Sequence, residues 1–111
     1  MIRRVSFLKR KPGLTTDEFL ARWMGSHAEL VAQLPGLRGW RFTHVDRSAP
    51  EAAWDGLGEQ WFDSIADCDR AFSTEPLRTA LFADREQCIG ESQACIVEEV
   101  PGFTPPWGTP R

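Results

Sequence analysis

Several features that mark other classes of protein are missing from this chain of 111 residues. No apolar run approaches the roughly 20 residues that a membrane-spanning helix needs. The segment MIRRVSFLKRKPG lacks the apolar stretch of a secretion signal. The three cysteines are odd in number and form no C-x-x-C pair, which argues against a disulfide framework and a zinc site. We therefore expect a cytoplasmic protein with free thiols and no membrane contact.

Charge of one sign is not concentrated anywhere either. The formal net charge is −3 and acids and bases are interspersed, so we expect no nucleic-acid partner. Five basic residues near the N-terminus are interpreted as a solvated strand edge and turn: Arg3, Arg4, Lys9, Arg10 and Lys11. There is no glycine-rich phosphate loop, no Ser-His-Asp pattern and no flavin or nicotinamide fingerprint. His27 and His44 are a weak metal signal, so we expect neither cofactor nor metal.

Aromatic residues are abundant instead. Five tryptophans and seven phenylalanines are many for so short a chain, and 41% of its residues are hydrophobic. This length suits one domain of common size. The aromatic residues suffice for its core and can also form the walls of an apolar cavity.

Periodicity and turn signals predict the order β-α-β-β-α-β, with the second helical region split in two. We expect strands at Ile2–Lys9, Leu37–Val45, Leu57–Phe62 and Gln93–Val100, and helices over Thr15–Leu34, from Ser64, and, as a short element, from Thr74. This order is that of the ferredoxin-like α+β fold, with a four-stranded antiparallel sheet and both helical regions on one face. Residues 1–100 then form the domain, and residues 101–111 form a Pro-rich tail.

The first predicted helix has a clear beginning and an unusual inward face. Thr15 and Glu18 form a capping-box pattern at its start. At about 100° per residue, His27 falls inside the apolar arc that Trp23 and Leu34 mark. An inward histidine is either a satisfied core residue or, kept neutral by burial, a proton acceptor in a cavity.

The predicted strands are apolar on both sides, although helices are expected on one side only. Monomers seldom expose apolar patches beyond a few hundred Å². A homodimer formed sheet to sheet would bury the bare face, and we expect one.

Two sequence blocks resemble those of the EthD family, dimeric α/β-barrel proteins named for a member associated with ethyl tert-butyl ether degradation. The first block comprises Lys11, Gly13, Leu14, Thr15, Glu18, Phe19, Trp23, His27, Leu34, Pro35, Gly36 and Leu37. The second block comprises Asp55, Gly56, Leu57, Glu59, Trp61, Phe62, Asp63 and Ser64. The resemblance covers nearly the whole chain to about Val100.

This resemblance implies a pocket between sheet and helices, with His27 facing it. The chain is also distantly similar to methylmuconolactone methylisomerase, in which the matching histidine works with a cysteine and a tyrosine. Their positions here fall at Gln60 and near Trp40, and the chain contains no tyrosine.

Six further residues are candidates for substrate binding, each with a purely structural alternative. Asp55 is either an acid or base at the pocket mouth or part of a turn with Gly56. Gln60 either orients a substrate carbonyl or hydrogen-bonds His27. The others are core residues or aromatic walls for a flat ligand: Trp23, Trp40, Phe42 and Phe62.

The function that we expect is binding, and conversion, of a small hydrophobic or cyclic carbonyl compound in degradation or secondary metabolism. His27 would act as general acid and base without metal or organic cofactor. Two alternatives stay open at this point: a non-catalytic carrier or accessory protein, and a haem-binding barrel with His27 or His44 as axial ligand.

Overall fold

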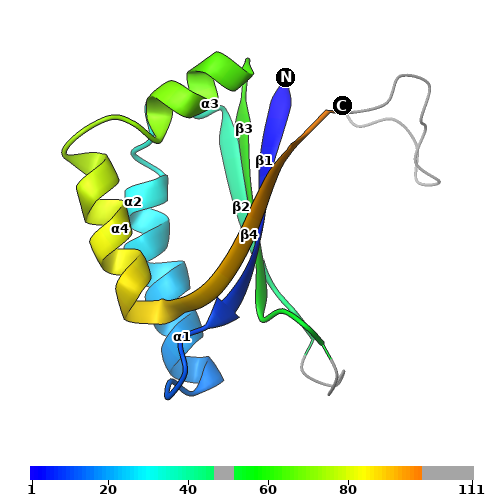
Figure 1. The fold of residues 1–111 in the computed structure, drawn as a ribbon, viewed down its shortest axis with the longest axis vertical. Helices are drawn as coiled ribbons and strands as arrows, with labels where there is room; N and C mark the ends of the chain where they lie inside the picture. The colour runs from blue at the N-terminus through cyan, green and yellow to red at the C-terminus, as the bar shows by residue number, and fades with distance from the viewer. Residues whose placement is uncertain (47–51, 99–111) are drawn as a thin grey trace.

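Four strands and a set of helices on one side of them make up the fold (Figure 1). The computed structural model describes residues 1–46 and 52–98. The expected tail, residues 101–111, and part of the long loop, residues 47–51, lie outside them. The elements are β1 (Ile2–Arg10), α1 (Thr16–Arg22), the π-helix η1 (Trp23–His27), α2 (Ala28–Val31), β2 (Gly39–His44), β3 (Gly56–Phe62), α3 (Ile65–Ala71), α4 (Leu77–Cys88) and β4 (Ile89–Val97).

The sheet has the order β2-β3-β1-β4, with every neighbouring pair antiparallel. This confirms the predicted ferredoxin-like α+β fold. Ser6 of β1 lies opposite Gly58 on one side and Ala94 on the other. Because side chains alternate along a strand, the even-numbered residues of β1 face the helices. Its odd-numbered residues form part of the open face, on the side of the sheet away from the helices.

The start of α1 follows the sequence prediction closely. The Thr15 side chain accepts a hydrogen bond from the Glu18 backbone N–H at 3.1 Å, and Glu18 Oε1 accepts one from the Thr15 N–H at 2.9 Å. These two bonds satisfy backbone groups that the first helical turn leaves without partners. The predicted capping box is therefore confirmed, and it fixes where the helix that carries His27 begins.

Two predicted boundaries are wrong at the other end of the chain. The helix expected to be short is α4, 12 residues long, and it runs directly into β4. That strand begins at Ile89 rather than Gln93. Gly90, Glu91 and Ser92 have little intrinsic preference for a strand, but pairing of Ile89 with Arg10 and of Ser92 with Leu8, on either side of a register irregularity, overrides it. A Cβ at position 90 would lie 3.0 Å from the Arg10 carbonyl oxygen, so the glycine permits this close approach.

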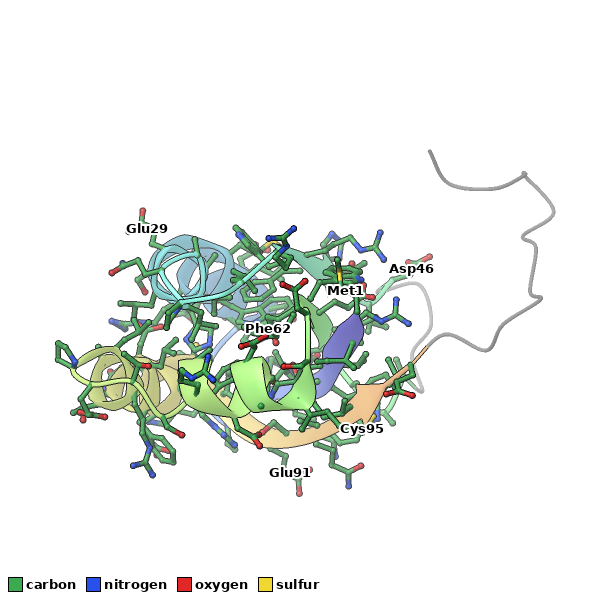
Figure 2. The ribbon with its side chains drawn as sticks, turned by 90° about the horizontal axis from the view of Figure 1, so that it is seen from above. Met1, Glu29, Asp46, Phe62, Glu91 and Cys95 are labelled. Atoms are coloured by element: carbon green, nitrogen blue, oxygen red, sulfur yellow. The ribbon has the colours of Figure 1, made fainter. Side chains whose placement is uncertain are left out.

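The core lies between sheet and helices and has two parts. Phe62, fully buried, packs with Ile2, Val31 and Leu34 in the first, and Figure 2 shows Phe62 in the interior while Glu29 and Glu91 lie at the periphery. The second contains Leu8, Phe19, Trp23, Cys88 and Ile89.

One glycine of β3 is required by this second part of the core. A Cβ at Gly56 would come within 2.7 Å of the Trp23 ring, a distance that real contacts do not reach. Burial of Trp23 against the sheet therefore depends on the missing side chain at position 56.

Candidate functional site

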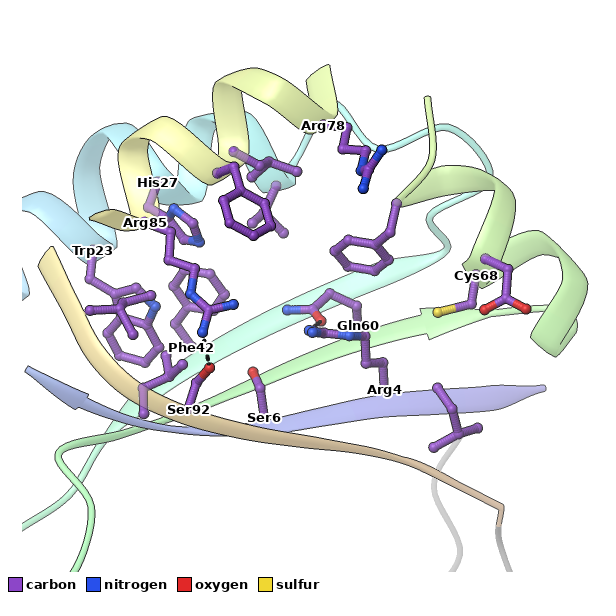
Figure 3. A pocket seen from close by; sticks show the side chains of 18 residues that line it. Arg4, Ser6, Trp23, His27, Phe42, Gln60, Cys68, Arg78, Arg85 and Ser92 are labelled. Carbon is purple, nitrogen blue, oxygen red and sulfur yellow. Dashed lines mark hydrogen bonds between the residues drawn. The ribbon is translucent and has the colours of Figure 1, made fainter. Parts of the chain in front are cut away.

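A cavity of about 310 Å³ lies between the helix side of the sheet and the helices (Figure 3). That volume is at the lower end of the range for small-molecule sites. Four of the seven predicted site residues line it: Trp23, His27, Phe42 and Gln60. The structure thus brings residues from η1, β2 and β3 around one space.

The helix widens where it passes the cavity. The sequence predicts a continuous α-helix from Thr15 to Leu34, whereas residues Trp23–His27 form a π-helix and the regular helix ends at Val31. The Ala28 N–H donates to the Trp23 carbonyl five residues earlier, which is the π pattern. Single π turns inside α-helices are frequent at functional sites, and this one begins and ends with residues that line the cavity.

His27 is paired with an acid that the sequence prediction did not identify. Its Nδ1 lies 3.0 Å from Oδ2 of Asp84 on α4, and both side chains are 12% exposed. Ser26 donates a hydrogen bond to the other oxygen of Asp84 at 2.8 Å. An ionised carboxylate only accepts hydrogen bonds, so Nδ1 carries the hydrogen. In the neutral ring Nε2 therefore keeps its lone pair, as a general base requires.

Burial lowers the pKa of His27 below its ordinary value, and the nearby positive charges of Arg85 and Arg4 act in the same direction. The hydrogen bond to Asp84 and its negative charge oppose this shift but are outweighed. The imidazole is consequently neutral at pH 7 and able to accept a proton.

Three aromatic rings are stacked beside the histidine. Trp23 lies face to face with Phe42, with ring centroids 4.4 Å apart and planes 5° apart, and Phe19 stacks on Trp23 with centroids 5.3 Å apart. The Trp23 Nε1 hydrogen is buried and has no partner among the described residues. Phe42 is also 6.3 Å from the His27 ring. Phe19 and Trp23 are fully buried, so a flat apolar group entering the cavity would meet Phe42, next to the imidazole.

The remaining predicted site residues lie elsewhere. Trp40 is 41% exposed and touches Phe42 edge-on, outside the cavity lining. Asp55 does not line the cavity, and its side chain accepts a hydrogen bond from the Arg10 backbone N–H at 2.8 Å, so it ties the start of β3 to the end of β1. Phe62 belongs to the core, where it packs against Phe72, and does not line the cavity.

Gln60 does line the cavity, but its partner differs from the one that the sequence suggested. Its Oε1 accepts a hydrogen bond from Arg4 Nη1 at 3.3 Å. The alternative in which Gln60 hydrogen-bonds His27 is replaced by the bond between His27 and Asp84.

The sequence prediction also missed two cations of the cavity lining. Arg4, interpreted as part of a solvated strand edge, is partly buried and points to the helix side of β1, and Arg85 reaches the cavity from α4 (Figure 3). Signals for both Arg4 and Asp84 exist in the sequence. Arg4 has the same parity as the inward Leu8, and Asp84 stands three residues after Leu81 and four before Cys88 on an otherwise apolar helix stripe.

The two buried thiols are poor nucleophiles. Burial raises the pKa of Cys68, which lines the cavity, and raises the pKa of Cys88 to about 11. Because the thiolate is the reactive form, both remain thiols at neutral pH. In residues 1–46 and 52–98, moreover, no three His, Cys, Asp or Glu side chains gather as metal ligands. The helices of this described part are all too short or too polar to cross a bilayer.

The comparisons with known proteins agree with this architecture. An EthD domain model matches residues 11–92, while no curated protein matches the chain. An EthD family protein from Bacillus halodurans has a TM-score of 0.74 at 24% identity, over 90% of this chain and 100% of its own. A dimeric ferredoxin-like protein of unknown function from Thermobifida fusca has a TM-score of 0.68 at 19% identity, over 86% and 88% of the two chains.

A hydroxynitrile lyase from Passiflora edulis is similar as well, with a TM-score of 0.71 at 15% identity over 92% of this chain and 95% of that chain. Identities this low show a shared fold and leave the reactions of these proteins their own. The family match, by contrast, spans most of the chain and includes the helix that carries His27. The protein belongs to the EthD family.

Proposed function

We propose that this protein binds a small cyclic or otherwise hydrophobic carbonyl compound and moves a proton next to the carbonyl, with His27 as general base and acid. The observation that carries the proposal is the His27–Asp84 pair at 3.0 Å, which leaves a neutral imidazole with a basic Nε2 at the cavity. Phe42, which the fully buried Trp23 supports from behind, supplies a surface for the apolar part of the ligand.

The proposed step breaks one C–H bond beside the carbonyl. Nε2 of His27 takes the proton, and the electron pair moves into the carbonyl to give an enolate. The imidazolium then returns the proton to the same carbon or to another one, so the reaction needs no oxidant and no leaving group. Asp84 holds the ring in one tautomer and stabilises the imidazolium while it exists. A positioned base of this kind contributes about 10²- to 10⁴-fold.

We further propose that the protein acts as a homodimer joined through the open face. Phe7, Trp61 and Val97 lie on that face, and Phe7 is 39% exposed. Glu59 on the same face is only 4% exposed and is held by two arginines. Ferredoxin-like neighbours from Thermobifida fusca and Bacteroides fragilis are described as dimeric. The free cysteines fit the reducing cytoplasm that we propose as the location.

Hydrogen–deuterium exchange tests the proposed chemistry. With 1-indanone in D2O, NMR should show loss of the protons beside the carbonyl faster with protein than without it. His27→Gln should reduce the exchange by about 10²-fold or more, whereas His44→Gln, which removes the exposed histidine at the end of β2, should leave it unchanged. Equal exchange by His27→Gln and the unmodified protein would contradict the proposal. Ligand binding without any exchange would identify the protein as a carrier.

A further inference from the structure

We infer that the ligand of this cavity carries a carboxylate, which Arg4 and Arg85 bind while its apolar ring lies against Phe42. The inference rests on the proposed function for the site itself and adds the charge of the substrate class. Its basis is that both guanidinium groups line the cavity and that, in the described part of the chain, neither forms an ion pair.

Arg4 is surrounded by groups that do not neutralise it. It donates to the neutral amide of Gln60 at a long 3.3 Å, and its guanidinium carbon lies 4.5 Å from the centre of the Phe72 ring. Burial, together with the nearby charge of Arg85, lowers the pKa of Arg4. Burying a charge without a counter-ion costs free energy, so such groups are rare. A bound anion would supply the missing counter-ion.

Arg85 reaches the same space from the opposite layer. Its Nη2 donates to the Ser92 hydroxyl at 2.5 Å, another neutral partner, and Figure 3 shows the side chain extending from α4 across the cavity to β4. The two arginines act electrostatically on each other and on His27. They therefore belong to one local cluster of positive charge beside a neutral histidine.

The other charged residues at the cavity do not cancel this cluster. Arg78 adds a third positive charge to the lining, and Asp69 is the one carboxylate among the described lining residues. Both are exposed, and within the described ranges no ion pair joins Asp69 to Arg4 or Arg85. Asp84 is already engaged through both of its oxygens, by Ser26 and by His27.

A planar guanidinium matches a carboxylate in shape as well as charge, since its N–H groups form a fork that binds both oxygens. The neutral side chains of Gln60 and Ser92 already orient the two forks. With the carboxylate held there, the reacting carbon of a cyclic keto acid lies between the arginines and the imidazole. The same positive charges stabilise the enolate that proton removal creates.

Two probes of the same shape, one charged and one neutral, show how much the ligand's negative charge contributes to binding. Quenching of tryptophan fluorescence, checked by calorimetry, would measure binding of 3-oxoindane-1-carboxylate and of 3-oxoindane-1-carboxamide. The protein should bind the acid about tenfold or more tightly than the amide, because charge-assisted hydrogen bonds are the stronger ones. Equal affinity for the two probes overturns the inference without the need for any variant.

Variants then assign the preference to the two arginines. Arg4→Gln combined with Arg85→Gln should bring the ratio of affinities to about one, with binding of the acid weakened much more than binding of the amide. Arg38→Gln, at an exposed arginine that pairs with Asp63, is the matched control and should keep the preference. If circular dichroism shows that the double variant is folded and it still prefers the acid, the inference is overturned. The single variant Arg85→Lys keeps the positive charge and should retain most of the preference for the acid.

Failure of this inference and failure of the proposed function give different results. His27→Gln should keep the preference for the acid and lose hydrogen–deuterium exchange. A preference for the acid without any exchange leaves the carboxylate site standing and removes the proposed chemistry. Exchange of 1-indanone without a preference for the acid probe supports the proposed chemistry and removes the carboxylate site.

Discussion

The two faces of the sheet treat buried charge in opposite ways. On the open face, Glu59 is 4% exposed, and Arg3 and Arg41 both reach its carboxylate at 2.9 Å. On the helix side, Arg4 and Arg85 have only the neutral Gln60 and Ser92 as hydrogen-bond partners among the described residues. Glu59 and Gln60 are neighbours in the same strand, so the difference arises within one step of the chain.

This difference separates a surface suited to a protein partner from a cavity suited to a small molecule. A face that neutralises its charges internally can be covered by an apolar partner without leaving an ion stranded. A cavity that leaves two cations without counter-ions binds most strongly to whatever supplies the negative charge. The comparison makes definite predictions for single substitutions on the two faces.

The largest effect is expected at Glu59. Glu59→Gln keeps the shape but removes the charge that Arg3 and Arg41 bind. Both arginines are partly exposed, with side chains 37% and 62% accessible, so water can solvate them, and urea unfolding should show a loss of about 2 kcal/mol from the weakened charge-assisted hydrogen bonds. Sedimentation should also show weaker dimerisation. Glu91→Gln is the control because its pair with Lys9 is well exposed, with side chains 70% and 45% accessible, and it should change stability by less than about 0.5 kcal/mol. A similar small loss at both sites would contradict the contrast.

Cysteines on the two sides of the sheet extend the comparison to alkaline pH. Burial raises the pKa of Cys88 to about 11 from an ordinary value of 9.0, so above pH 9 the unfolded chain releases its proton first. Stability is therefore full below pH 9 and falls as the pH rises toward 11, by roughly 2 kcal/mol in total. Urea unfolding at several pH values should show a smaller loss of stability between pH 9 and 11 in Cys88→Ala than in the unmodified protein. Cys95→Ala, at an exposed thiol on β4, should retain the full loss.

A smaller effect of opposite sign is expected at Arg4. Arg4→Met replaces a partly buried cation without a counter-ion by an apolar chain of similar length, and the free energy of unfolding should rise by about 1 kcal/mol. Arg41→Met on the open face should lower it by about 1 kcal/mol, because the buried Glu59 loses one hydrogen bond and one of its two ion-pair partners. Thermal unfolding of the two variants checks the signs. Destabilisation by Arg4→Met would mean that its stacking on Phe72 matters more than its charge.

The sequence predicts what depends on local pattern and leaves out what depends on distant pairing. The capping box at Thr15 and the inward position of His27 follow from spacing within one helix, and both are found in the structure. Asp84 is 57 residues from His27 and lies on a helix expected to be short, so no local pattern joins the two. The sequence alone places Arg4 in solvent, because charged side chains are usually exposed and a solvated strand edge accounts for the basic residues around it. Arg4 has an even number in β1, like the inward Leu8, and this alternation indicates that its side chain points toward the helices.

The widened helical turn could not have been predicted either. Gly25 lies in its middle and weakens helix propensity, but a Cβ there would meet nothing within 4 Å, so no packing requirement marks the position. The turn becomes visible only as a backbone hydrogen bond from Ala28 to Trp23. Local propensity thus gives the helix, and tertiary packing decides how its inward face is spaced.

The smallest expected change is confined to one proton on His27. Asp84→Asn removes the negative charge that raises the pKa of His27, so this pKa should fall further; Arg85→Gln removes a charge that lowers it, so the pKa should rise. NMR titration of the ring Cε1–H signal would measure both shifts, with His44→Gln to assign the two histidines. Exchange activity needs the neutral ring, so in Arg85→Gln it should begin at a higher pH than in the unmodified protein.

The two variants differ in a second way that a merely structural role would not produce. The amide that Asp84→Asn introduces can donate a hydrogen to Nδ1, which would move the ring proton to Nε2 and remove the base from the cavity. This variant should therefore lose activity at every pH despite the lower pKa of its histidine, whereas Arg85→Gln should keep the histidine in its active tautomer. Unchanged activity in Asp84→Asn would mean that the carboxylate only packs beside the ring. The proposed proton transfer therefore depends on the orientation of one imidazole by an acid on α4.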